Sequence, residues 1–154
     1  MLIHHFGSRE GLLTEVVRRM EADQRAFLAS LDLAPEQALD QMWQRLRDPS
    51  VWPAERLFFE CYARATRGES PFASLLPGLV DDWLDAAVRL RLVWPGDERT
   101  ERARARAGLA IIRGLLLDLV ATGDREGADD AFGELRALIT AGAPGRDVGT
   151  MRGA

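Results

Sequence analysis

Apolar residues recur at helical spacing along almost the whole chain, and no segment keeps up the strict alternation that is typical of a half-buried strand. Proline and glycine fall between these periodic segments, where they interrupt the pattern. The pattern therefore predicts an all-α fold with short loops and antiparallel neighbouring helices. Residues 9–142 are expected to form the folded body, and the small, polar residues 143–154 a flexible tail.

Capping residues, prolines and glycines predict where each of six helices begins and ends. Ser8 is a good N-cap for the first helix, and Gly68 and Gly123 are plausible C-terminal stops for the third and fifth. Pro77 should kink or break the fourth. The predicted limits are Arg9 to about Leu31, Pro35 to about Asp48, Pro53 to Gly68, Ser70 to Trp94, Asp97 to Gly123 and Arg125 to about Ala141.

Length and charge narrow the class of protein. A chain of 154 residues is long enough for one domain with a real core. Its formal net charge of -4 is a poor match to a free-standing nucleic-acid binder, which normally carries a basic patch. No apolar run is long enough to span a bilayer, and the start lacks the pattern of a signal peptide. These features favour a cytoplasmic protein.

Catalytic and metal-binding signals are weak. Cys61 is the only cysteine, so no internal disulfide is possible, and we interpret it as a buried, inert thiol. His4 and His5 are adjacent, so they would point in different directions on a helix, and the sequence offers no third histidine for a metal. There is no nucleophile–base pair and no glycine-rich phosphate loop. We therefore expect neither an enzyme nor a cofactor.

The first residues of the chain are unusually apolar. Leu2, Ile3 and Phe6 precede a Gly7-Ser8 turn, and a segment this short cannot form a stable helix alone. Their side chains need partners either on the body of the domain or in a segment that precedes them.

The segment Leu2–Leu13 resembles the signature at the end of the recognition helix in the TetR (tetracycline-repressor-type) family. A leucine, the His5-Phe6 pair and the Gly7-Ser8 turn lead into Arg9-Glu10 and then Leu12-Leu13, in the order that the family shows. The resemblance implies that residues 1–8 are the remnant of a helix-turn-helix DNA-binding domain. Its first two helices and most of the recognition helix would precede Met1, so we expect either a start codon assigned too late or a deliberately shortened chain.

The resemblance also implies roles for the polar residues of this segment. In a full-length protein, His4, His5 and Arg9 would contact DNA phosphates, which set the register of a complex rather than its sequence choice. The alternative is that they are ordinary polar residues at a helix end. Operator DNA is a partner only if the missing N-terminal helices are present.

In the family, a ligand cavity lies among the central helices. Aromatic and apolar walls with a few polar groups suit a small-molecule pocket, although plain core packing explains any single residue as well. A charged stripe on the third helix, Arg56 to Arg67, reads as a solvated face, with Arg56 or Glu60 as alternative ligand anchors. The predicted pocket residues are Met42, Trp43, Trp52, Phe58, Phe59, Tyr62 and Trp83.

The last two helices resemble the pair that forms a four-helix bundle across the two-fold axis of the family's dimers. Gly108, Ala110 and Gly114 would let a neighbouring backbone approach closely, and Arg113 and Asp118 are candidates to pair across the axis. Burial inside one monomer is the alternative. The predicted interface residues are Leu109, Ile112, Arg113, Leu116, Leu119, Phe132, Leu135 and Ile139.

Together these features predict a homodimeric, ligand-responsive transcription regulator, a repressor, that binds a small apolar or aromatic ligand. The alternative is a short helical module that binds a ligand or a partner protein and has no DNA-binding function.

Overall fold

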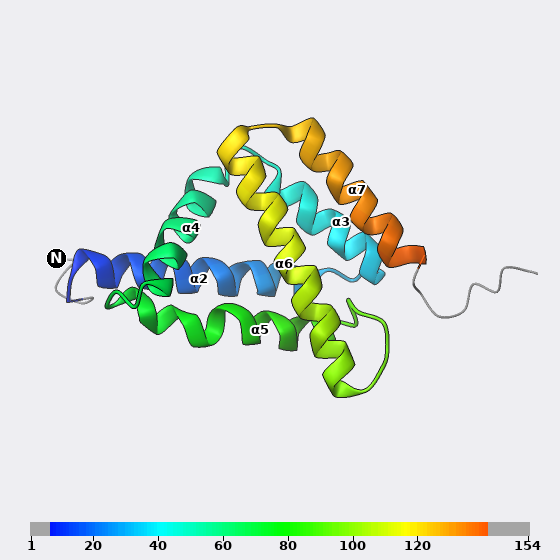
Figure 1. The fold of residues 1–154 in the computed structure, drawn as a ribbon, viewed down its shortest axis with the longest axis horizontal. Coiled ribbons are helices and arrows are strands. Elements are labelled where there is room, and N and C mark those ends of the chain that lie inside the picture. The colour runs from blue at the N-terminus through cyan, green and yellow to red at the C-terminus, as the bar shows by residue number, and fades with distance from the viewer. Residues whose placement is uncertain (1–6, 142–154) are drawn as a thin grey trace, which may run out of the picture.

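The computed structural model describes residues 7–141, which form six α-helices and one 3₁₀ turn (Figure 1). The all-α prediction is confirmed. The predicted tail at 143–154 and residues 1–6 lie outside the described residues. The elements are α2 (Arg9–Ser30), α3 (Pro35–Leu46), α4 (Trp52–Thr66), η1 (Phe72–Leu75), α5 (Leu76–Arg89), α6 (Glu98–Thr122) and α7 (Arg125–Ala141).

The predicted capping residues begin and end the helices. The side chains of Ser8, Asp97 and Asp124 each accept a hydrogen bond of 2.9 Å from a backbone N–H at the start of α2, α6 and α7. Such bonds satisfy donors that the first turn of a helix leaves unpaired. Gly123 has a φ of 75°, the left-handed conformation that ends α6 and turns the chain into α7.

Pro77 produces the expected break. The chain forms η1, restarts as α5 at Leu76, and places Pro77 in the first turn, where a missing N–H does no harm. The helix then ends at Arg89, earlier than the sequence suggested. Arg91 has a φ of 55°, and the following residues form a loop rather than a last turn of helix. Leu92 in this loop packs against the core.

Helices α2 and α5 lie side by side and run in the same direction, and α4 crosses them near the start of α2 (Figure 1). Helix α6 runs through the middle and contacts α4, α5 and α7. Helix α7 is fastened to α3 because Asp129 pairs with Arg47 at 2.6 Å and accepts a hydrogen bond from Trp43. This arrangement surrounds the space between α2, α3 and α6 with apolar side chains.

The core has a dense part and a more open part. Around α4, Val17, Phe58, Cys61 and Phe72 are almost completely buried. Cys61 is the buried free thiol that the sequence predicted, and its burial raises the pKa of that thiol. Towards α3 and α7, the apolar residues pack around the cavity described below.

Candidate ligand cavity

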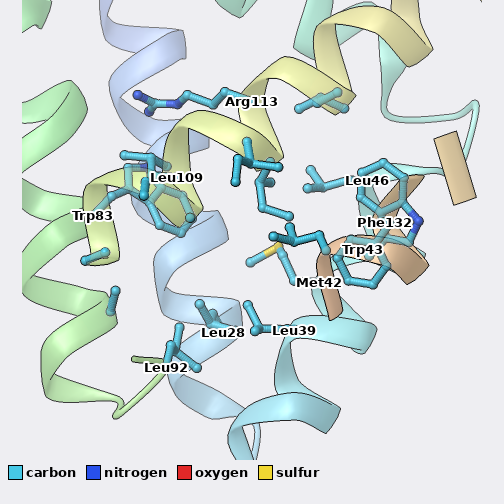
Figure 2. Close-up of a pocket in the computed structure, with 18 of the residues that line it drawn as sticks. Leu28, Leu39, Met42, Trp43, Leu46, Trp83, Leu92, Leu109, Arg113 and Phe132 are labelled. Carbon is cyan, nitrogen blue, oxygen red and sulfur yellow. The ribbon is translucent and has the colours of Figure 1, made fainter. Parts of the chain in front are cut away.

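A cavity of about 370 Å³ lies between α2, α3 and α6 and is closed further by α4, α5, α7 and the loop after α5 (Figure 2). This volume falls in the range of pockets that hold drug-sized molecules. Its walls are mostly apolar. Aliphatic side chains among them are Leu28, Leu39, Met42, Leu46, Leu92, Leu109, Ile112 and Leu116.

One end of the cavity has an aromatic wall. Trp43 stacks on Phe132 with ring centroids 4.8 Å apart and planes 7° from parallel. The indole Nε1 of Trp43 donates a hydrogen bond of 2.8 Å to Asp129 Oδ1. Because the one polar atom of Trp43 already has a partner, the two rings offer only ring faces and carbon atoms to a ligand. Arg136, which also borders the cavity, pairs with Asp40.

The opposite end carries buried charge. Trp83 and Arg113 lie across the cavity from Trp43 and Phe132 (Figure 2). Trp83 Nε1 and Arg113 Nη2 both donate to Glu21 Oε2, at 2.7 Å and 2.9 Å. Arg113 also donates to the Leu79 carbonyl at 2.7 Å. The Glu21 and Arg113 side chains are 7% and 14% exposed, so they form a nearly buried ion pair with further hydrogen bonds.

Arg113 is held by aromatic rings as well as by hydrogen bonds. Its guanidinium carbon lies 5.1 Å from the centroid of the Phe58 ring and 5.7 Å from that of Tyr62. Both distances are within the range of cation–π contacts. The guanidinium is therefore fixed in position by α2, α4 and α5.

A second carboxylate, Glu55 in the first turn of α4, lies beside this pair. It is 3% exposed and accepts a hydrogen bond of 2.6 Å from Gln24 Nε2. Among residues 7–141 it has no ion-pair partner, because Arg113 is engaged with Glu21.

The two acids differ in how their charges are compensated. Burial, and next the charge of Glu21, raise the pKa of Glu55 to about 7, against smaller opposing effects of Gln24, Arg113 and Arg45. Burial also raises the pKa of Glu21, opposed mainly by Arg113. Near neutral pH, Glu55 is thus divided between its protonated and ionised forms.

Of the seven predicted pocket residues, the structure brings four to the cavity: Met42, Trp43, Phe58 and Trp83. The other three do not line the cavity but pack against the core: Trp52, Phe59 and Tyr62. Successive residues of a helix point about 100° apart, so Phe59 and Phe58 cannot share a direction. Trp52 Nε1 is buried without a hydrogen-bond partner among the described residues.

The sequence patterns did not lead to a prediction of the two acids, Glu21 and Glu55, that stand beside Arg113. Glu21 follows Val17 by four residues and precedes Leu28 by seven, so it lies on the buried stripe of α2. Glu55 similarly stands three residues before the buried Phe58. A carboxylate at a buried position of an apolar stripe is the signal that could have identified both residues.

The predicted interface residues of α6 and α7 face inward. Leu116, Leu119 and Phe132 are buried within the monomer, and Leu109, Ile112 and Leu135 are half-buried at the cavity. The side chain of Ile139 lies outside those described. The predicted pairing of Arg113 with Asp118 across a two-fold is wrong, because Arg113 binds Glu21 of its own chain. The large apolar side chains turn inward because they fill the space between α3, α6 and α7.

The outward face of α6 carries small residues instead. Leu117 is 48% exposed, and no described atom lies within 4 Å of a Cβ built on Gly114. Gly108 also has open space at its Cβ position, but it borders the cavity. On α7, Leu138 is 70% exposed and also borders the cavity. Ala107 is exposed and also borders the cavity. We call the following stripe of α6, with spacings of three and four residues, the outer face: Ala103, Ala107, Ala110, Gly114, Leu117 and Ala121.

The charged stripe of α4 does not reach the cavity. Arg56 Nε and Nη2 donate to the Val120 carbonyl at 3.2 Å and 3.0 Å, which ties α4 to α6. Glu60 is exposed, and Arg64 pairs with Glu69 at 2.6 Å. Neither Arg56 nor Glu60 lines the cavity. Arg9 is exposed at the start of α2, whereas His4 and His5 lie outside the described residues.

Other kinds of site find no support in the part of the chain that the structure describes. It contains no group of three histidine, cysteine or acidic side chains that could hold a metal ion. Within 7–141, no helix combines the length and apolar character needed to cross a bilayer. Comparison of the chain with protein-family models, curated proteins and solved structures gives no match. Functional inference therefore depends on the motif at the start of the chain and on the cavity.

Proposed function

We propose that this chain is the ligand-sensing and dimer-forming part of a cytoplasmic TetR-type transcription regulator, a repressor with no catalytic activity. The observation that carries the proposal is the cavity, because it lies against the helix that follows the DNA-binding signature. Glu21, Gln24 and Leu28 of α2 all line it. Operator DNA would be bound through a helix-turn-helix domain of which residues 1–8 are the remnant.

The geometry suggests how a ligand acts at a distance. Helix α2 has 22 residues and so extends roughly 33 Å. It begins at the signature and passes the cavity along its second half. A ligand that fits the cavity better in one position of α2 than in another shifts the balance between those positions, and with it the spacing of two DNA-binding heads.

The proposal includes a homodimer formed through the outer face of α6 together with α7. Glycine inside a helix costs about 1 kcal/mol relative to alanine. Gly114 on the outer face has no neighbour among the described residues that requires a glycine. Close approach of a second α6 across a two-fold axis gives it a packing role. Sedimentation equilibrium is expected to show a dimer, and Gly114→Arg to convert it to a folded monomer.

Selection of genomic DNA by the native protein tests the regulatory role. The protein is isolated from its source cells, its intact mass is measured, and the genomic fragments that it retains are sequenced. We expect a mass above 17.1 kDa and enrichment of a two-fold symmetric site. Deletion of the gene should then raise transcription beside that site. A native protein that retains no sequence selectively would contradict the proposal and favour the short helical binding module.

A further inference from the structure

We propose that the cavity binds a lipophilic organic cation whose ammonium group forms an ion pair with Glu55. The inference rests on the proposed sensing role of the cavity and adds the chemical class of the ligand. Three properties of the cavity carry it: the balance of its buried charges, the engagement of Arg113 with Glu21, and the mainly apolar character of its remaining walls.

The buried charges do not balance. At the polar end, the cavity is lined by two carboxylates, Glu21 and Glu55, and only one guanidinium, that of Arg113, contacts either of them there. Arg113 contacts Glu21 at 2.9 Å, so that pair is neutral. Glu55 is left with the amide of Gln24, a neutral donor that satisfies one oxygen atom. A buried carboxylate without a cationic partner is costly, so Glu55 must take up either a proton or a cation.

The surroundings of Glu55 set the pH range in which a cation can replace the proton. Glu21 faces it from α2, Arg113 from α6 and Arg45 from α3, and the unfavourable effects of burial and of Glu21 outweigh the two arginines. The pKa of Glu55 is consequently raised to about 7. At pH 8 the ionised form predominates and is available to a cation, whereas at pH 6 a proton competes for the same carboxylate.

An anionic ligand is disfavoured by the same geometry. Arg113 Nη2 already donates to Glu21 and to the Leu79 carbonyl, and the guanidinium lies over the Phe58 ring. A carboxylate ligand that paired with Arg113 would have to displace Glu21 and leave that acid buried without a partner, at a cost that a single new ion pair does not offset. The other two arginines that border the cavity are also engaged, because Arg104 donates to the Trp94 and Pro95 carbonyls and Arg136 pairs with Asp40. A cation meets Glu55 without breaking any contact between residues of the chain.

The rest of the cavity fits the body of such a ligand. Beyond the polar end, the walls are mainly leucine, isoleucine and methionine side chains that lead to the stacked Trp43 and Phe132 rings. A drug-sized molecule with an aromatic group at one end and an ammonium group at the other can bury both groups favourably in this cavity. The inference therefore specifies a lipophilic amine or quaternary ammonium compound, not a small hydrophilic cation.

Isothermal titration calorimetry with three matched probes tests the inference on the chain of 154 residues. The probes are 4-phenylbutyltrimethylammonium, its uncharged isostere in which carbon replaces nitrogen, and 5-phenylpentanoate. At pH 8 we expect the cation to bind about tenfold or more tightly than the isostere, and the carboxylate most weakly. Between pH 8 and pH 6 the affinity for the cation should fall by about tenfold, because the charge of the probe is permanent and Glu55 titrates in this range.

Two variants locate the effect. Glu55→Gln keeps an oxygen for Gln24 and removes the charge, so it should bind cation and isostere equally and lose the pH dependence. Glu60→Gln removes an exposed carboxylate of the same helix that does not line the cavity, and it should behave as the wild type. Thermal unfolding of Glu55→Gln verifies that the variant folds.

The outcomes separate this inference from the proposed function. If the isostere or the carboxylate binds as tightly as the cation, or if Glu55→Gln keeps the preference, the cationic assignment is wrong and the cavity remains a sensor for another class of ligand. If none of the probes binds at either pH, the cationic assignment is overturned. The sensing role is then decided by the DNA selection described above.

Discussion

Each end of the cavity has a tryptophan whose indole N–H needs a hydrogen-bond acceptor, and the two acceptors differ in their burial. At the α3–α7 end, Trp43 directs its N–H to Asp129, which is partly exposed and also pairs with Arg47. At the α2–α5 end, Trp83 directs its N–H to Glu21, which is buried with Arg113. The first end therefore contributes packing at little electrostatic cost. At the second end, burying charged groups lowers the stability of the fold. Such a cost is typical of groups retained for binding.

The ion pair at the polar end should give the largest response to mutation. Arg113→Met leaves Glu21 buried and unpaired, so we expect a loss of about 3–5 kcal/mol in the free energy of unfolding, measured with urea at pH 8. The double variant Glu21→Gln/Arg113→Met removes both charges and should recover most of that loss. Equal destabilisation in the single and double variants would mean that the pair contributes only packing.

The pH dependence of stability should come from the same end. The raised pKa of Glu55 means that the folded state binds a proton more tightly than the unfolded chain does, whose pKa is 4.5. Stability is therefore highest below pH 4.5 with respect to this group, and falls as the pH rises to about 7. Glu55→Gln should remove this fall and be more stable than the wild type at pH 8 by about 2–3 kcal/mol.

Thermal melts from pH 5 to pH 8 of wild type, Glu55→Gln and Glu60→Gln measure this effect. Because Glu60 is exposed, its variant should follow the wild-type curve. Parallel curves for wild type and Glu55→Gln would show that Glu55 does not titrate in this range.

The aromatic end should respond least. Trp43→Phe keeps a ring to stack on Phe132 but removes the hydrogen bond to Asp129, whose carboxylate still pairs with Arg47. We expect a loss of about 1 kcal/mol in the free energy of unfolding by urea, without pH dependence between pH 6 and pH 8. A pH-dependent loss would show that the aromatic end is electrostatically coupled to the charged end, and would contradict its description as a packing contact.

Local signals were sufficient to predict the number of helices and most of their ends, the end of α5 at Arg89 excepted. Ser8, Asp97 and Gly123 act on the backbone within a few residues, so their effects can be read without knowing the fold. The polar cluster depends on distant contacts instead. Glu21 and Arg113 are 92 residues apart, and neither residue type reveals that the other will be beside it.

The orientation of α6 was predicted incompletely for a similar reason. Its apolar residues surround most of the helix, with leucine and isoleucine on one side and alanine and glycine on the other. Periodicity alone does not say which side faces the core. Packing favours the larger side chains inside, so Leu116 and Leu119 are buried and Gly114 is left outside.

The most direct test of the central claim, that the cavity is a ligand site, is calorimetric titration of 4-phenylbutyltrimethylammonium into a variant whose cavity is filled. Ala87 lines the cavity, whereas Ala63 is exposed on α4, so Ala87→Phe and Ala63→Phe add the same side chain in two different places. We predict that Ala87→Phe lowers the affinity at pH 8 by about tenfold or more and that Ala63→Phe leaves it unchanged. Equal affinities in the two variants, with both folded, would place the binding site outside the cavity and contradict the account.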